Sequence, residues 1–445
     1  MSHWKHKTMS DIINYILQFL LGDHITPEIK GQVGYTSNPE EFHLYKLVIL
    51  PSTFFDADIY GTDKTLPQLP LHIWEENPIL FGDPFTEQMG ETRILHADLI
   101  ASTFFLISRY EEMVRRNVRD VHGRFPGKES LPYRAGFIDR PLVEQYGKLL
   151  RAQLREVGCD APEPPSQIQK IYLTHDLDQI AHFRTVRSLV GGLLRGLKRP
   201  KEGHKAMKSF FGGIRYDPWY TFPFLYKVNN ELINIIGKAR CEAILFIRSG
   251  GGKRKEDRPF SNLIHPDYKK LIRYSKKKGV TIALHSSYNA GINPDLIHEE
   301  KKKLDHHVRN LSNYNRNHYL DSREPENMQA LIEAGITDDF TMGYADMAGF
   351  RLGTCRPVKW INLQTKQVTS LTLHSLAIMD ISLSDKRYMY MNAHDAYQYC
   401  EQLINCVESY NGELVLLWHN TMVEKTVQLY HRKLYKDITK YLASK

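Results

Sequence analysis

The 445-residue sequence predicts an α/β protein in which a seven-stranded (β/α) barrel follows a smaller α/β domain. Three observations lead to this expectation. The chain is too long for one ordinary hydrophobic core. A proline-rich stretch interrupts it near one third of its length, at residues 158–165. After that stretch, apolar β-rich runs alternate with helical patterns, as in parallel sheets that are built from βα units.

The predicted N-terminal domain covers residues 1–160. Residues 12–22 (IINYILQFLLG) have some features of a signal-peptide core, but polar residues interrupt them and no small-residue cleavage site follows, so we expect a helix packed on this domain. Residues 44–50 predict a strand, and residues 97–114 predict an amphipathic helix. The prolines within residues 158–165 forbid a continuing helix, so this stretch is the predicted linker.

The predicted barrel covers residues 166–445. Its strand candidates are apolar without strict alternation, as expected for strands that are covered on both faces. They lie at residues 171–175, 243–249, 280–285, 314–320, 336–342, 371–379 and 413–419. Helical patterns, several of them closed by glycine, lie at residues 266–278, 299–311, 326–334 and 393–410. Repeated βα units of this kind predict closure into a barrel.

Composition limits the expected partners and compartment. The formal net charge of +8 favours anionic partners, although an ordinary basic surface explains it equally well. No base-reading helix, stacking platform or phosphate-cradling glycine loop is recognisable, so nucleic acid is not an expected partner. The five cysteines are scattered without a CxxC pair, which argues against a disulfide framework and a cysteine-based zinc site. With no stretch that is long enough to span a bilayer, we expect a cytoplasmic protein.

Ionisable side chains follow several predicted strands. In a parallel (β/α) barrel the carboxyl ends of the strands meet at one mouth, where substrate sites form. A single histidine at a strand end is more often a hydrogen-bonded core residue than a ligand, but four strand ends that carry ionisable groups favour a functional site. The residues at these ends are Thr174, His175, Asp176, Asp178, Arg248, His285 and His419.

Asp176 and Asp178 are the most informative pair. They are two residues apart, so they project to one face if the strand geometry persists. Two close carboxylates repel each other when both are ionised. The repulsion is relieved if one of them binds a cation, and the other is then left as a base. Aspartate and histidine ligands together suit zinc or another first-row divalent ion, which would activate water near neutral pH. The alternative is a turn without a metal.

Four short motifs, in this order, resemble the polysaccharide deacetylases, carbohydrate esterase family four. They are LTHDLD at 173–178, ALHSSYN at 283–289, RNHYL at 316–320 and LLWHN at 416–420. The segment ADLIASTFFLISRYEE at 97–112 is similar to a bacterial branch of that family with an extra N-terminal domain. The resemblance implies a distorted barrel of the deacetylase type. It also implies a catalytic base at Asp176, metal ligands at Asp178 and His285, and an orienting arginine at Arg316.

The chain departs from the family pattern at Asn289, where the second motif normally carries another metal-binding histidine. His318 lies two residues after Arg316 and is expected on the same side of the strand, so we predict Asp178, His285 and His318 as the metal triad, with zinc as the expected ion. The neighbouring His306 and His307 are weaker candidates, because they lie in a charged helical pattern.

The last strand end resembles the family's fifth motif, which implies that His419 is a general acid. Amide hydrolysis expels an amine that leaves poorly unless it is protonated, and imidazole titrates in the right range. Asp380 either orients this histidine or caps a helix. Arg351, in the glycine-containing stretch 349–357 with Arg356, and Trp418 are predicted substrate-binding residues. Structural salt bridges explain the two arginines equally well.

Residues 184–208 combine eight basic side chains with the apolar run SLVGGLL. Such a segment favours either a solvated helical insertion or contact with an anionic membrane or a lipid-linked substrate.

The function predicted from these residues is metal-dependent removal of an N- or O-linked acetyl group from a sugar of a cell-envelope glycan or its precursor. The alternative is a catalytically inactive glycan-binding or scaffold protein on the same barrel. Retention of a divalent metal distinguishes the two.

Overall fold

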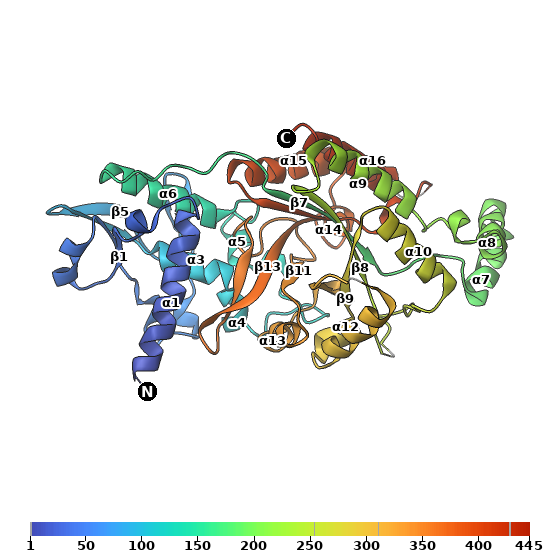
Figure 1. Cartoon of the computed structure of the whole chain (residues 1–445), viewed down its shortest axis with the longest axis horizontal. Coiled ribbons are helices and arrows are strands. Elements are labelled where there is room, and N and C mark those ends of the chain that lie inside the picture. The colour runs from blue at the N-terminus through green and yellow to red at the C-terminus, as the bar shows by residue number, and fades with distance from the viewer. Residues whose placement is uncertain (1, 253, 310, 427–428) are drawn as a thin grey trace.

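The larger part of the computed structural model is a closed barrel of parallel strands (Figure 1). The structure describes residues 2–252, 254–309, 311–426 and 429–445. The strand order is β11-β10-β9-β8-β7-β14-β13, and β11 pairs with β13 to close the barrel. The seven strands are β7 (Lys170–Leu177), β8 (Cys241–Ile247), β9 (Thr281–Ser286), β10 (Tyr314–Asn317), β11 (Asp338–Met342), β13 (Gln367–Met379) and β14 (Glu413–Leu417). The predicted fold class and all seven predicted strands are therefore confirmed.

Side chains fill the inside of the barrel. Tyr172, Phe246, Phe340 and Leu417 belong to one buried apolar cluster that the strands enclose. The barrel is therefore a packed core, with room for a site only at its mouth. An additional strand that the sequence did not predict, β12 (Val358–Asn362), pairs antiparallel with β13 outside the parallel set.

Helices surround the barrel (Figure 1). They are α9 (Phe222–Ile236), α10 (Pro266–Lys277), α11 (Tyr288–Ile292), α12 (Leu296–His307), α13 (Glu326–Glu333), α14 (Asp380–Ser384), α15 (Ala393–Ser409) and α16 (Leu429–Leu442). Helix α10 shows how local sequence sets the ends: Pro266 begins it, where no N–H is needed, and Gly279 follows it at φ +74°. The helix predicted at residues 299–311 begins earlier and ends at His307; residue 310 lies outside the described residues.

The N-terminal part is a mixed sheet with helices. Its strand order is β1-β2-β6-β5, with β1 (Val33–Tyr35), β2 (Leu47–Ile49) and β6 (Thr92–Ala97) parallel and β5 (Gly82–Met89) antiparallel. A small hairpin of β3 (His72–Trp74) and β4 (Asn77–Ile79) accompanies it. Its helices are α1 (Ser2–Leu21), α2 (Pro27–Lys30), α3 (Leu99–Ile107), α4 (Tyr110–Val114), α5 (Leu131–Arg134) and α6 (Leu142–Glu156). The single helix predicted at residues 97–114 is wrong, because Arg109 adopts φ 54° and separates α3 from α4.

The two parts are joined by ion pairs and apolar packing. Helix α1 packs on α6, as predicted for the first helix, and also lies against β13. Glu112 accepts two hydrogen bonds from Arg351, at 2.9 and 2.7 Å, and Glu144 accepts one from Arg356 at 3.0 Å. One cluster of buried apolar residues runs through both parts, so the division into residues 1–160 and 166–445 stays a prediction.

None of the five cysteines forms a disulfide. Among the helices of the described residues, none combines the length and the apolar character that are needed to cross a lipid bilayer.

Candidate metal centre at the mouth of the barrel

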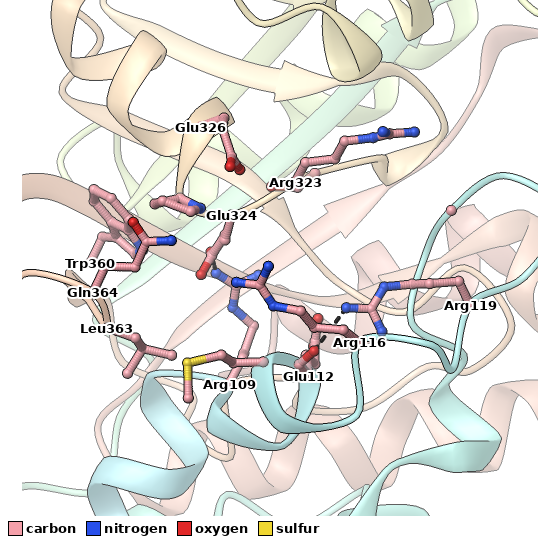
Figure 2. A pocket seen from close by; sticks show the side chains of 14 residues that line it. Arg109, Glu112, Arg116, Arg119, Arg323, Glu324, Glu326, Trp360, Leu363 and Gln364 are labelled. Atoms are coloured by element: carbon pink, nitrogen blue, oxygen red, sulfur yellow. Dashed lines mark hydrogen bonds and ion pairs between the residues drawn. The ribbon is translucent and has the colours of Figure 1, made fainter. Parts of the chain in front are cut away.

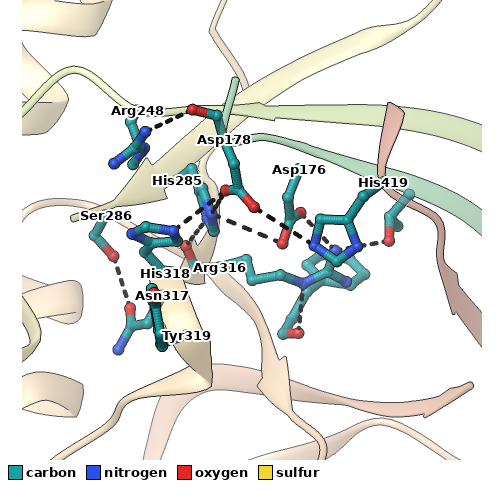
Figure 3. A network of polar contacts seen from close by, with 12 residues as sticks. Asp176, Asp178, Arg248, His285, Ser286, Arg316, Asn317, His318, Tyr319 and His419 are labelled. Carbon is teal, nitrogen blue, oxygen red and sulfur yellow. Dashed lines mark hydrogen bonds and ion pairs between the residues drawn. The ribbon is translucent and has the colours of Figure 1, made fainter. Parts of the chain in front are cut away.

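The carboxyl ends of β7, β9 and β10 bring one aspartate and two histidines together (Figure 3). Oδ1 of Asp178 lies 3.3 Å from Nε2 of His285 and 3.3 Å from Nε2 of His318. One ligand atom from each of these residues lies within 4.8 Å of the other two. The predicted triad therefore meets in space, although β10 ends at Asn317 and His318 follows the strand in a tight turn.

Both histidines are oriented by their second ring nitrogen. Nδ1 of His285 donates to the carbonyl oxygen of Arg316 at 2.8 Å, and Nδ1 of His318 donates to Oδ1 of Asp257 at 3.0 Å. A neutral imidazole carries only one N–H, so these bonds leave the Nε2 lone pairs facing Asp178. Burial lowers the pKa of His318, which favours the neutral, metal-binding form. Metal-binding histidines in proteins show this arrangement.

The polar atoms of this cluster are placed to bind a cation, and two of them have no hydrogen bond to any described residue of the protein. Among the described residues, Oδ1 of Asp178 and Nε2 of His285 are buried without a hydrogen-bond partner, which is costly in a folded protein. Nitrogen and oxygen ligands about 2.1 Å from a tetrahedral zinc ion lie about 3.4 Å from one another. The 3.3 Å separations match that spacing. Asp178, His285 and His318 therefore form a donor set that is suited to a divalent metal.

Asp176 lies beside this triad and is held by Arg316. Nη1 of the fully buried Arg316 donates to Oδ1 of Asp176 at 3.0 Å and to the hydroxyl of Thr174 at 2.7 Å. Oδ2 of Asp176 lies 3.8 Å from Nε2 of His285. One carboxylate oxygen is thus fixed, while the other faces the metal-binding cluster. This is the relationship that the sequence resemblance implied for a base and its orienting arginine.

His419 approaches from the end of β14 and pairs with Asp380. Nδ1 of His419 donates to Oδ1 of Asp380 at 2.8 Å, and its backbone N–H donates to Oδ2 at 2.7 Å. Burial opposes protonation of His419, but the charge and hydrogen bond of Asp380 raise its pKa to about 10. Nε2 of His419 lies 3.7 Å from Oδ2 of Asp178. Of the two roles considered for Asp380, the contacts place it as the partner of His419.

A cavity of about 260 Å³ opens onto these side chains. Asp176, Asp178, His318 and His419 line it, whereas His285 and Arg316 are not among its lining residues. Its rim also includes Arg124, which comes from the N-terminal part and donates to the carbonyl oxygen of Tyr319 at 2.9 Å. The N-terminal part therefore contributes a residue to the mouth of the barrel.

Two predicted substrate-binding residues do not reach this cavity. Arg351 is buried and paired with Glu112, which is the structural role that the sequence left open. Trp418 is completely buried, and its ring packs against Tyr435 with the ring centroids 5.1 Å apart. Neither side chain lines the cavity, because each is occupied by structural packing.

Asn289 and the two weaker histidine candidates lie outside the metal-binding cluster. The side chain of Asn289 accepts a hydrogen bond from Nε of Arg254 and is not part of the metal-binding cluster. His306 and His307 lie at the end of α12, outside that cluster. The family pattern has a metal-binding histidine at the position of Asn289. In this chain, His318 lies beside Asp178 and His285 instead.

Sequence reasoning missed Asp257, Arg124 and Tyr319. Asp257 is fully buried in the segment between β8 and α10, and it also accepts hydrogen bonds from the backbone of Tyr288 and Asn289. Tyr319 adopts φ 64°, a left-handed conformation that is uncommon outside glycine and often found at functional sites. Metal-binding histidines usually donate their other ring N–H to a carboxylate or a carbonyl group. That requirement could have led from His318 to a search for a partner such as Asp257.

A second cavity, of about 400 Å³, lies between the N-terminal part and the barrel (Figure 2). Its wall includes Arg109, Arg116, Arg119 and Arg323, and Arg109 forms an ion pair with Glu324 across the junction. None of its described lining residues is a histidine or cysteine. Its composition fits a charged junction between the two parts and does not provide the ligand set found at the barrel mouth.

Residues 3–158 match a family described as "Family of unknown function (DUF7033)", which covers about a third of the chain. Comparison with curated proteins gives no match. Among solved structures, the chain is similar to a crystal structure described as a "putative polysaccharide deacetylase from Mycobacterium smegmatis", at 13% identity and a TM-score of 0.40 over 64% of this chain and 86% of that one. A similarity of this level assigns no role to individual residues of this chain.

Proposed function

We propose that this protein is a metal-dependent hydrolase that removes an acetyl group from a sugar. The observation that carries the proposal is the cluster of Asp178, His285 and His318, with Asp176 and His419 beside it (Figure 3). A ligand set, a held carboxylate and a paired histidine around one cavity are the parts that hydrolysis of an amide or ester requires.

Asp178, His285 and His318 would hold the metal. Their orientation is set before any ion arrives, since Asp257 and the carbonyl oxygen of Arg316 fix the two rings. A divalent ion supplies a Lewis acid that lowers the pKa of water and polarises an acyl oxygen. Zinc is the ion proposed, because one carboxylate and two imidazoles are ligands that it commonly takes.

Asp176 is the proposed proton acceptor. Arg316 fixes Oδ1 of Asp176 at 3.0 Å, so Oδ2 remains directed toward the cluster. A carboxylate in this position can take a proton from a water molecule that attacks an acyl carbon. The role of Arg316 is positioning, because its guanidinium contacts Asp176 and Thr174 and does not line the cavity.

His419 is the proposed proton donor to the departing group. Its raised pKa keeps the imidazolium charged at neutral pH, and its side chain lines the cavity. An amine expelled from an amide leaves poorly unless it is protonated, so a charged histidine is suited to this step. Asp380 holds the ring and stabilises its charge.

The substrate class rests on the resemblance of the four strand-end motifs to polysaccharide deacetylases. It implies an N- or O-acetylated sugar of a cell-envelope glycan or its precursor. The cytoplasmic setting predicted from the sequence favours a precursor over a finished polymer.

The test measures bound metal and acetate release with the same preparation. We expect about one equivalent of zinc by elemental analysis, and acetate release from short N-acetylglucosamine oligomers or O-acetylated sugars. Chelation should abolish the release, and added zinc should restore it. Asp176→Asn should retain the metal and lose activity by about 10²- to 10⁴-fold. A protein that carries less than about a tenth of an equivalent of metal, and whose glycan binding is unchanged by chelation, would instead be the inactive glycan-binding alternative.

A further inference from the structure

Two helices form a hairpin between the first two barrel strands. They are α7 (Val186–Gly196) and α8 (Pro200–Gly212), at the right-hand end of the molecule in Figure 1. The hairpin follows β7, the strand whose end carries Asp176 and Asp178. It therefore belongs to the loops at the carboxyl end of the barrel, where the candidate site opens.

Helix α7 is amphipathic, but it turns its apolar face toward solvent. Its exposed large apolar residues are Val186, Val190, Leu193 and Leu194, and Leu197 follows just after its end. They recur at the three- and four-residue spacing that places side chains on one face of a helix. Leu197 is 82% exposed. Helices of globular proteins normally bury such a face.

Glycines explain why the apolar face is left outside. Gly192 packs against Ala206 and Phe183, and a Cβ added at Gly196 would lie 2.8 Å from Cα of Gly203. The two helices therefore approach each other through small residues, and no large apolar side chain is needed between them. Of the nineteen large apolar side chains that are exposed in the described residues, seven lie on this hairpin, including Met207 and Phe211 of α8.

Positive charge surrounds this apolar face. Residues 186–212 contain seven lysines and arginines but one acidic residue, Glu202, a net charge of +6 against +8 for the whole chain. Arg187, Lys198, Arg199 and Lys201 are all exposed. An apolar face bordered by basic side chains is the pattern of helices that lie in the interface of anionic membranes.

We propose that the α7–α8 hairpin docks on the surface of an anionic phospholipid bilayer. The leucines and Phe211 enter the boundary between headgroups and acyl chains, and the lysines and arginines contact lipid phosphates. The hairpin also adjoins the candidate site. A cavity at its base, lined by Phe183, Trp219 and Met422, shares Gln179 with the cavity that holds Asp178. Docking therefore places the mouth of the barrel close to the membrane surface.

Vesicle sedimentation with the full chain tests this proposal without any measurement of activity. The vesicles are pure phosphatidylcholine, or phosphatidylcholine with about a third phosphatidylglycerol. We expect binding to the anionic vesicles only, weakened by high salt. Leu194→Gln with Leu197→Gln should weaken it about tenfold or more. Lys198→Gln with Arg199→Gln should weaken it by about fivefold for each charge removed.

The matched control is Leu44→Gln with Ile235→Gln, which removes two apolar side chains of similar exposure, 60% and 64%, from other surfaces. It should bind vesicles as the wild type does, and thermal melting should show that all variants are folded. Absence of wild-type binding to anionic vesicles, or an equal loss in the control, overturns the proposal. A wild-type dimer that the leucine variant converts to a monomer, with vesicle binding unchanged, would assign the surface to a second copy of the chain and also overturn it.

Discussion

Asp257 accepts a hydrogen bond from Nδ1 of His318 at 3.0 Å, and Nε2 of the same ring lies 3.3 Å from Asp178. Burial opposes ionisation of Asp257, but the hydrogen bonds from His318 and from two backbone N–H groups lower its pKa to about 2. It is therefore a carboxylate at neutral pH. A carboxylate behind a metal-binding histidine fixes the ring and increases the basicity of the coordinating nitrogen.

Asp257→Asn should therefore weaken metal binding without removing a ligand. Loss of such an outer carboxylate typically costs about 10- to 100-fold in metal affinity. The measurement is a zinc competition titration with a chromophoric chelator. His318→Ala, which removes the proposed ligand itself, should weaken binding more than Asp257→Asn does.

His306→Ala is the control for this series, because His306 is an exposed histidine on α12 outside the cluster. Its zinc affinity should equal that of the wild type. If Asp257→Asn also binds zinc with wild-type affinity, the contact with His318 has no part in metal binding.

Asp380→Asn should reduce turnover while the metal content stays unchanged. The asparagine loses the negative charge that stabilises the imidazolium of His419, so less of the protonated form is available. We expect kcat to fall by about 10²-fold for an N-acetylated substrate. The fall should be smaller for an O-acetylated substrate, because an alkoxide leaves more readily than an amine anion. Equal losses on both substrates would argue that Asp380 acts on the fold and not through proton donation.

Arg124→Ala should raise KM more than it lowers kcat. Arg124 lines the cavity and contacts Tyr319 and Asp120, but it has no contact with Asp176 or His419 in the structure. We therefore predict that Arg124 binds substrate and takes no part in proton transfer. Steady-state kinetics on one acetylated sugar gives both constants. Arg116→Ala, in the other cavity, is the matched arginine control (Figure 2). A change confined to kcat would contradict this placement.

The barrel strands were predictable from the sequence because each is an apolar run that is buried on both faces. β12 (VKWIN) was missed, since a short antiparallel strand of mixed composition has no comparable pattern. The interruption of the helix at Arg109, between α3 and α4, was also missed. A positive φ at an arginine is imposed by the surrounding structure and leaves no mark in the local sequence.

The residues of the candidate site were predictable where they follow strands. Asp176, Asp178, His285 and His419 were recognised in that way, and the structure brings them together. Asp257 and Arg124 lie in irregular segments, so only the completed fold places them at the site. Arg351 is a different case, because it was predicted to bind substrate and does not line the cavity. An arginine beside glycines has the same local sequence whether it meets a ligand or a glutamate, and its partner Glu112 is 239 residues earlier.

His374 gives a prediction for stability at the other end of the barrel. Its Nε2 lies 3.0 Å from Asp338 and its Nδ1 lies 2.8 Å from Glu413, and the side chain is almost fully buried. Burial opposes protonation, but the two carboxylates raise the pKa of His374 to about 9. Both ring nitrogens therefore carry protons at neutral pH, and the imidazolium bridges β11, β13 and β14.

This raised pKa means that stability should fall in alkaline solution. The unfolded pKa is about 6.5, so the contribution of His374 is complete below about pH 6.5 and is lost as the pH rises through about 9. A difference of about 2.5 pKa units corresponds to at most about 3 kcal/mol of unfolding free energy. Urea unfolding at pH 6 and pH 9.5, with chelator present throughout, measures the loss. His374→Gln should be less stable than the wild type at pH 6 and should lose less between the two values. Parallel pH dependence in both proteins would show that the charge of His374 does not stabilise the barrel.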